Sequence, residues 1–358
     1  SVPAGIRLFI RARAEMLRTG TPRWNFRVFD NTSVDAPLYV LDGSSFCADA
    51  VTLTRNLHAD AGFTSSGNVD GPRAAAPFAI LDSMYRAYTK VLGVQPNAVF
   101  PALQIGWSPD NVPADGGTGT GVCASNGNIG TSFYADSTLC VLGANDLDTD
   151  EYDDHALIHE WAHYFEDQFS RSDTIGGAHT IEDQLDLRLA FSEGFGNAWA
   201  GIVTDDPVYR DSLGTNQSQS SDFDIDSDPV SRPGWYNEAA IHQVLYDLYD
   251  AGPGDDDALA LGLGPIYQVM VGPQRTGVPL TSVFSFLSSL KTLNPASVAS
   301  INAIASGQGI HGTDAYGSGE TNTAGNADVL PAYTALTVNG SAVTRCSTDF
   351  FGTYNALG

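Results

Sequence analysis

Basic residues are scarce in this sequence. Its 358 residues include 17 Lys and Arg against 42 Asp and Glu, so the formal net charge is −25, and lysine occurs only at Lys90 and Lys291. A surface of this sign repels phosphate backbones and anionic membrane faces. We therefore expect no nucleic-acid partner.

Long apolar runs are also missing. No stretch approaches the roughly 20 apolar residues that a membrane-spanning helix needs, and no basic segment followed by an apolar one marks a signal peptide. The chain begins at Ser1 rather than at Met, from which we expect a processed or excised form of a longer precursor. We expect a secreted or cell-surface protein without a membrane span, acting as a monomer.

Cysteines are few, and none belongs to a CxxC pair. The four are Cys47, Cys123, Cys140 and Cys346. This spacing fits two disulfides better than a zinc knuckle and indicates an oxidising compartment. Of the three pairings that four cysteines allow, we expect Cys123–Cys140, which closes a local loop, and Cys47–Cys346, which ties the two ends together.

The acidic residues form short clusters, at 145–154, 222–228 and 255–257. Solvated loops are the preferred interpretation of such clusters, ahead of calcium binding. The sequence "DLDTDEYDDHAL" begins like an EF-hand loop but has Glu151 at the sixth position and Leu157 at the twelfth. This excludes an EF-hand, whereas an irregular Ca²⁺ site built from oxygen ligands stays open.

The apolar content of 42% is typical of a globular protein. Residues 1 to about 70 alternate basic, aromatic and β-branched side chains between Gly and Asn turns, which predicts β-strands. Residues 131–143 are interpreted as two short strands joined at Ala135–Asp136, and the last residues return to β-like alternation. Periodic apolar residues predict helices over 73–93, 150–170, 182–203, 237–250 and 280–293.

Two histidines stand four residues apart in "HEWAH", at His159 and His163, with Glu160 directly after the first. On a helix the two imidazoles project from nearly the same side, so both can turn toward one ion. Glu160 leans over the same site without filling a coordination position, and its carboxylate can take a proton from a zinc-activated water that attacks a carbonyl. Ordinary helices also contain this motif, with the histidines hydrogen-bonded in the core.

A catalytic zinc site needs a third protein ligand and an open position for water. The pattern HExxHxxGxxH fails because Glu166 and Phe169 occupy its Gly and His positions, which excludes a metzincin. Thirty residues after His163, Glu193 stands in the apolar sequence "LAFSEGFGNAWAGI". An unpaired carboxylate there would be costly, and a cation would explain it. An arginine such as Arg188 could pair with Glu193 instead.

Two more histidines could take part. His155 lies one turn before His159; it could be a fourth ligand, but we prefer a role in lining the cleft or capping the helix start, since a fourth ligand would close the position that water needs. His179, in a Gly-rich loop, is the other candidate third ligand. A flexible loop suits that role less well than the helix that carries Glu193.

The sequence resembles the gluzincins, zinc peptidases with HExxH and a glutamate on a second helix, of which thermolysin and fungalysin are examples. The resemblance covers about residues 128–250, and "HEWAH" and "SEGFGNAW" are its specific motifs. "SFYADSTLCVLGAND" is similar to the strand and turn before the zinc helix, where an edge strand holds an extended substrate. "NEAAIHQVLYDLYD" is similar to the helix after the oxyanion-stabilising residue.

The resemblance implies an α+β fold: a two-lobed zincin catalytic core with the active-site helix at the lobe interface and the metal in the cleft. It implies a β-rich flanking segment at 1–70, a catalytic lobe with the edge strand and HExxH helix at 71–170, and a mostly helical catalytic lobe at 171–330. A β-like tail at 331–358 would begin a further domain. Substrate would lie along the edge strand near Ser132–Tyr134.

Residue by residue, the resemblance makes His159, His163 and Glu193 the zinc ligands of a secreted endopeptidase. Glu160 becomes the general base, which activates the water and later passes the proton to the leaving amine. The expected cofactor is Zn²⁺, with Ca²⁺ left open, and the expected partner is a protein or peptide substrate.

The sequence departs from the family at two supporting positions. Asn197 stands where the family often has an Asp that braces a ligand histidine, and an amide would raise the basicity of that imidazole less. The family's histidine at the start of the late helix is missing from "PGWYNEAA". Tyr236 is therefore the expected hydroxyl donor to the developing oxyanion, and His242 is the second choice. Either side chain could instead belong to the core.

Other functions stay open on the sequence alone. A catalytically silent zinc-bearing scaffold, such as an adhesin-type domain of a larger surface protein, is disfavoured by the intact Glu160 and Glu193. A metal-free binding module could use the β-rich ends. An aminopeptidase remains within the enzyme interpretation, although no glycine-rich exopeptidase anchor is recognisable.

Overall fold

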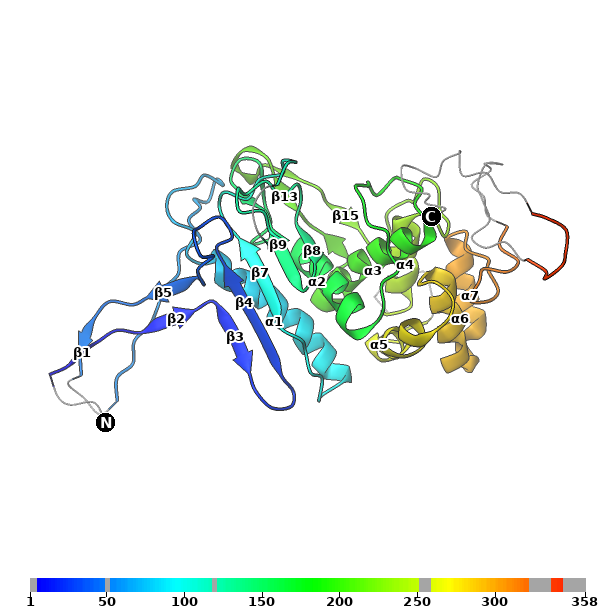
Figure 1. Cartoon of the computed structure of the whole chain (residues 1–358), viewed down its shortest axis with the longest axis horizontal. Coiled ribbons are helices and arrows are strands. Elements are labelled where there is room, and N and C mark those ends of the chain that lie inside the picture. Colours follow the sequence, from blue (N-terminus) through cyan, green and yellow to red (C-terminus); the bar gives the residue numbers. More distant parts are fainter. Residues whose placement is uncertain (1–4, 49–51, 118–120, 251–258, 322–335, 344–358) are drawn as a thin grey trace. The chain divides into compact units, whose positions relative to one another are not determined.

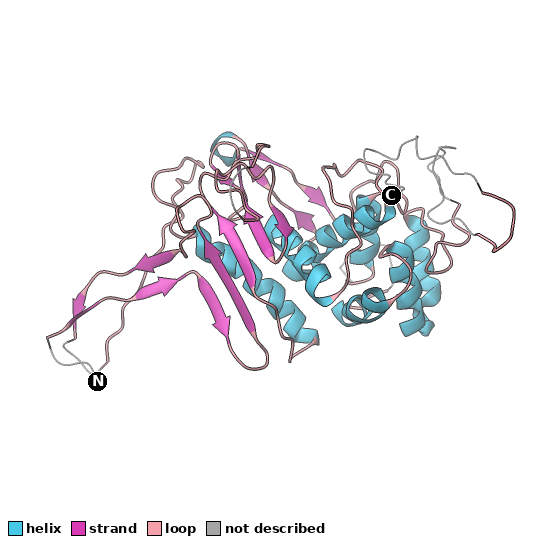
Figure 2. Cartoon of the chain, in the orientation of Figure 1, coloured by secondary structure: helices cyan, strands magenta, loops and turns pink. Residues whose placement is uncertain are grey.

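The computed structural model describes residues 5–48, 52–117, 121–250, 259–321 and 336–343 (Figure 1). The chain divides into two compact units, Ser1–Glu160 with Arg210–Ser221 and Trp161–Tyr209 with Asp222–Gly358. Strands predominate in the first unit and helices in the second (Figure 2). The predicted mixture of α and β structure is therefore confirmed.

A five-stranded sheet forms the centre of the first unit, with the strand order β3-β4-β7-β9-β8. The pairs β4–β7 and β7–β9 are parallel, whereas β3 and β8 pair antiparallel with their neighbours. Phe26 and Val28 of β4 are fully buried, because alternate side chains of a strand face the same side. The strands are β3 Glu15–Arg18, β4 Trp24–Phe29, β7 Leu103–Trp107, β8 Phe133–Ala135 and β9 Thr138–Val141.

Helix α1, Ala76–Val94, packs against β4 of this sheet. Its Tyr88 stacks on Trp24 with 4.4 Å between the ring centroids. A proline at the first turn suits a helix start, because the missing N–H would have no partner within the helix. The helix predicted over 73–93 is confirmed.

Strands β8 and β9 form the predicted hairpin. Its two-residue turn is Asp136–Ser137, one residue later than the expected Ala135–Asp136, and both residues have positive φ, 46° and 59°. Positive φ at both central residues is the geometry that matches the twist of the flanking strands. Strand β8 lies at the edge of the five-stranded sheet, so the structure contains an edge strand where one was expected, near Ser132–Tyr134.

The N-terminal segment is rich in β-structure, as predicted. Strand β1 pairs with β6, and β2 pairs with β5. Strands β3 and β4 of the same segment belong to the five-stranded sheet, so the segment also supplies part of the central sheet of the first unit. The additional strands are β1 Arg7–Leu8, β2 Arg11–Arg13, β5 Val40–Asp42 and β6 Phe46–Cys47.

Short strands from distant parts of the sequence form a four-stranded sheet in the first unit, in the order β10-β11-β13-β14. These strands are β10 Gly143–Ala144, β11 Asp148–Thr149, β13 Ser212–Leu213 and β14 Gln219–Ser220, with the 3₁₀ turn η1 at Thr215–Gln217. In the second unit β12, Val208–Tyr209, pairs with β15, Phe223–Asp224.

Helix α2, Asp154–Phe169, contains the HEWAH sequence. The division between the two units falls inside this helix, after Glu160. Its residues Trp161 and Phe165 belong to the second unit and stack on Trp199 of the same unit, with ring centroids 6.0 Å and 4.9 Å away. The predicted helix over 150–170 is confirmed, with its start at Asp154.

Capping side chains determine where three helices of the second unit begin. Asp186 accepts a hydrogen bond from Arg188 N at 2.9 Å, so α3 starts at Leu187 and not at residue 182 as predicted. Asn237 caps α4 in the same way, and Ser282 with Ser285 forms a capping box at α6. The helices are α3 Leu187–Thr204, α4 Glu238–Asp247, α5 Leu263–Val269, α6 Val283–Leu293 and α7 Val298–Gly307, with short turns η2 Met270–Gln274 and η3 Pro295–Ser297.

The predicted Cys123–Cys140 disulfide is present, with the two Cα atoms 5.5 Å apart. Cys47 is exposed, and Cys346 lies outside the described residues, so the Cys47–Cys346 pair stays a prediction. Of the predicted β-like tail, only 336–343 is described, and those residues form no strand. Within the described ranges, none of the helices has the length and apolar character of a membrane span.

Candidate metal centre

The HEWAH helix buries one face and leaves its two histidines on another. Leu157, Ile158 and Trp161 are fully buried, whereas His159 and His163 are only partly buried. The four-residue spacing places both imidazoles on the same side of α2. The helix sequence therefore presents two metal-ligating side chains at a partly accessible surface.

The structure brings Glu193 of α3 to these two histidines. The ligand atoms of His159, His163 and Glu193 all lie within 4.8 Å of one another. His163 Nε2 is 3.5 Å from Glu193 Oε2, close to the roughly 3.3 Å that separates two ligand atoms around a tetrahedral zinc with bonds of about 2.0–2.1 Å. Two imidazoles and one carboxylate are also a donor set that zinc favours, so these residues could hold a metal ion.

A glycine allows α3 and α4 to approach closely beside Glu193. A Cβ atom at Gly194 would lie 2.7 Å from the side chain of Ile241 and 2.9 Å from the carbonyl oxygen of Glu238, both in α4. Backbone and a branched core side chain cannot give way cheaply at such distances. Gly194 therefore keeps the first turn of α4 next to Glu193.

Two residues that the sequence did not single out as ligand supports contact Nδ1 of His163. Its Nδ1 is 3.4 Å from Glu166 Oε2 and 3.3 Å from Ser192 Oγ. Ser192 Oγ donates to Glu166 Oε2 at 2.6 Å. A carboxylate on one imidazole nitrogen directs the other toward a metal, and here Nε2 is the nitrogen near Glu193.

Glu166 is fully buried, and burial raises the pKa of its carboxyl, opposed by the hydrogen bond from His163. A buried carboxylate costs free energy unless it is paired. The sequence signal that could have identified Glu166 as a support was its i,i+3 spacing from His163 in an apolar helix. Asn197, which the sequence put forward as the brace, is buried on α3, and its supporting role stays a prediction.

We expect Glu166→Gln to lower zinc affinity by about 10–100-fold, because the amide keeps the shape but removes the charge that orients His163. Competition against a chromophoric chelator measures this affinity. Asp167→Asn, at an exposed position on the same helix, is the matched control and should leave it unchanged. Equal affinities in the two variants would show that Glu166 does not support the ligand.

The remaining candidates lie at different places. Glu160 follows His159 on α2 and is partly buried, whereas His155 is buried in the first turn of that helix and is not among the three converging residues. Tyr236 is fully buried, and its hydroxyl donates to Pro233 O at 3.2 Å. His242 is buried and stacks on Phe223, with ring centroids 5.5 Å apart.

His179 belongs to a second group of potential ligands, with Glu193 and Glu238. Its Nε2 is 3.5 Å from Glu193 Oε2 and 3.2 Å from Glu238 Oε2. Burial alone lowers the pKa of His179, but hydrogen bonds and charges from the two carboxylates outweigh it and raise the pKa to about 11. Arg188, the arginine considered as a partner for Glu193, forms an ion pair with Asp186 at 2.8 Å.

A third group, wholly in the first unit, consists of Asp148, Asp150 and Asp211. Burial raises the pKa of Asp150 well above its usual value, and the neighbouring charges of Asp148 and Asp211 add to this. Ser132 Oγ donates to Asp150 and accepts from Leu142 N. In this group Asp148 and Asp150, from the acidic stretch before α2, lie close to Asp211, about 60 positions later in the sequence.

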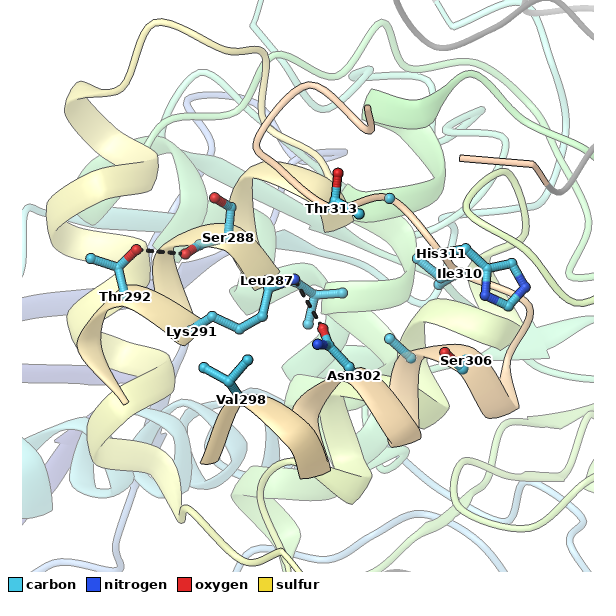
Figure 3. Close-up of a pocket in the computed structure, with 12 residues that line it drawn as sticks. Leu287, Ser288, Lys291, Thr292, Val298, Asn302, Ser306, Ile310, His311 and Thr313 are labelled. Atoms are coloured by element: carbon cyan, nitrogen blue, oxygen red, sulfur yellow. Dashed lines mark hydrogen bonds between the residues drawn. The ribbon is translucent and has the colours of Figure 1, made fainter. Parts of the chain in front are cut away.

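Two cavities lie elsewhere. One of about 540 Å³ in the second unit is lined by α6, α7 and the loop that follows, and Lys291 Nζ donates to Asn302 Oδ1 there at 3.0 Å (Figure 3). Another of about 440 Å³ in the first unit is lined by Tyr39, Arg73 and Trp107, among others. None of the three potential ligand groups lines either cavity.

Comparison with known proteins yields no matching family and no similar curated protein. The function is therefore argued from the chemistry of these residues.

Proposed function

We propose that this protein is a secreted zinc-dependent endopeptidase of the gluzincin type, with a zincin catalytic core. The observation that supports it most is the convergence of His159, His163 and Glu193, with Glu160 adjacent to the first ligand on the same helix. The Cys123–Cys140 disulfide supports an oxidising compartment.

The donor set fits zinc, because two neutral imidazoles and a carboxylate leave a fourth position open. When bound, the ion would polarise the scissile carbonyl and make water a stronger acid. Glu160 accepts a proton as the water oxygen bonds to the carbonyl carbon and the π electron pair moves to the carbonyl oxygen. When the C–N bond breaks, Glu160 returns that proton to the amine nitrogen.

The substrate would be an extended peptide paired with strand β8. This strand is at the edge of its sheet, and an edge strand can accept an extended peptide as one more strand through main-chain hydrogen bonds. Such pairing holds the backbone irrespective of side chains, which suits an endopeptidase.

The test is metal content by mass spectrometry together with hydrolysis of casein or a quenched peptide. One zinc per chain with activity is the expected result. Zinc without activity would favour a silent zinc-bearing scaffold, and a protein that takes up no zinc would overturn the proposal.

We propose Ca²⁺ as a second cofactor, held by Asp148, Asp150 and Asp211. Carboxylate oxygens are the ligands that Ca²⁺ prefers, and these three are within 4.8 Å of one another. Like charges this close oppose ionisation of the group, so a divalent cation would stabilise the ionised form.

Without divalent cations, we expect the free energy of unfolding to fall as the pH rises from about 4 to about 7. Burial raises the pKa of the adjacent Asp153 to about 6. A carboxyl group with a raised folded-state pKa contributes stability below its unfolded value of about 4 and loses it as the pH rises through the folded-state value. Urea unfolding in EGTA and in Ca²⁺ at several pH values measures this. Ca²⁺ should reduce the fall, because it would stabilise the ionised form of its proposed ligand Asp150, whose pKa burial also raises.

Asp150→Asn should abolish the response to Ca²⁺ and, in EGTA at pH 7, unfold at a higher urea concentration than the wild type, because a buried charge is gone. Asp222→Asn, at an exposed position, is the control and should respond to Ca²⁺ like the wild type. If Ca²⁺ did not change the stability of the wild type, Ca²⁺ would be ruled out as a cofactor.

A further inference from the structure

The loop between α2 and α3 places one imidazole beside the candidate metal ligands. His179 Nδ1 is 3.0 Å from the carbonyl oxygen of Gly177, which accepts its hydrogen bond. Gly177 has a φ of 116°, a backbone conformation that favours glycine. With Nδ1 engaged, Nε2 is the nitrogen that faces Glu193 and Glu238.

Glu238, on α4, positions the imidazole of His179. It is the first residue of that helix, and only 6% of its side chain is exposed. The partial positive charge of a helix N-terminus favours a carboxylate at this position. The close approach of α3 and α4 at Gly194 keeps Glu238 next to Glu193. His179 Nδ1 is thus hydrogen-bonded to the backbone, and Nε2 lies 3.2 Å from Glu238 Oε2.

We propose that His179, positioned by Glu238, is the hydrogen-bond donor that stabilises the negative charge developing on the carbonyl oxygen of the scissile peptide bond. This inference rests on the proposed function. The expected donors from the sequence were Tyr236 and His242, on the segment after Glu193. His179 instead precedes Glu193 in the sequence and lies in the loop before α3.

Accessibility favours His179 over those two residues. Its side chain is 21% exposed and lies 3.5 Å from an oxygen of the candidate ligand Glu193. The Tyr236 hydroxyl donates to a backbone carbonyl inside the core, and His242 packs face to face with Phe223. A substrate oxygen can reach an imidazole that is partly exposed, whereas the Tyr236 hydroxyl and the His242 ring are buried.

The chemistry requires no proton transfer from His179. As the water oxygen bonds to the carbonyl carbon, the π electron pair moves to the carbonyl oxygen, and the Nε2–H group donates to that oxygen. When the C–N bond breaks, the electron pair returns to re-form the carbonyl. A donor that is aimed at developing charge before the reaction lowers the barrier without reorganisation. Glu238 does not contact the substrate in this scheme and acts only by positioning the ring.

The test compares His179→Ala and Glu238→Gln with the wild type in zinc content, in kcat and KM for a quenched peptide, and in affinity for a phosphoramidate peptide and for a product peptide. For His179→Ala we expect one zinc per chain, a kcat lowered by about 100-fold and a KM changed by less than about threefold. Phosphoramidate affinity should fall with kcat, while product affinity stays. Glu238→Gln should give a smaller loss in the same pattern.

His311→Ala, an exposed histidine of the second unit, controls for loss of an imidazole and should resemble the wild type. Loss of zinc in His179→Ala would make His179 a metal ligand and overturn the inference. Unchanged kcat and phosphoramidate affinity would also overturn it. A wild type without activity would count against the proposed function itself, and phosphoramidate binding to zinc-loaded protein would still test His179 separately.

Discussion

Glu160→Gln should retain one zinc per chain and lose kcat by about 10²–10⁴-fold, the range that a positioned general base contributes. The amide preserves the size of the side chain and cannot accept the proton of the attacking water. The wild-type residue lies directly after His159 and is partly buried, so a neutral replacement should not disturb the fold. Mass spectrometry of the metal and peptide hydrolysis on the same sample give both quantities.

Asp167→Asn is the matched control for this experiment, since it neutralises an exposed carboxylate on the same helix. It should retain zinc and full activity. A Glu160→Gln protein as active as the wild type would show that another group takes the proton. Zinc lost together with activity would instead place Glu160 in the coordination of the metal.

Glu193→Gln should lose zinc and, with it, all hydrolysis. A residue that merely supports a ligand changes metal affinity by about 10–100-fold, so a direct ligand should have a larger effect. Its carboxylate is also the point at which the two histidine contacts meet, 3.5 Å from both His163 Nε2 and His179 Nε2. Dialysis against a chelator of known affinity, followed by metal analysis, measures the loss.

Glu182→Gln, an exposed carboxyl in the loop before α3, is the control and should bind zinc like the wild type. If Glu193→Gln kept its zinc at wild-type affinity, the third ligand would be another residue. His179 would then be the first residue to replace, because its Nε2 lies 3.5 Å from Glu193 Oε2.

Local patterns predicted most of the helices and the hairpin. The 3.6-residue spacing of apolar side chains in α1 and α2 and the Asp136–Ser137 turn between β8 and β9 depend only on neighbours in the sequence, so they could be predicted without tertiary contacts. The start of α3 was wrong by five residues, because the acidic stretch before Asp186 resembles a helix start and the actual cap is Asp186.

The residues that support the candidate metal centre were missed for a related reason. Glu166 was read only as a departure from the metzincin pattern, yet it contacts His163, three residues earlier on the same helix. Glu238 was not singled out from the sequence. Its significance depends on Gly194, where α3 and α4 come close enough for a carboxylate of one to approach a carboxylate of the other.

The sequence by itself determined the pair His159 and His163 on one side of a helix, with Glu160 beside them, because a four-residue spacing is a local property of the α-helix. It also marked Glu193 as a carboxylate in an apolar helix, which either a cation or an arginine could pair. Only the tertiary structure decided that His179 faces Glu193 and Glu238, and that Asp211 joins Asp148 and Asp150. Those contacts join segments about 15–60 residues apart, and their geometry depends on how helices and strands pack rather than on a periodic pattern.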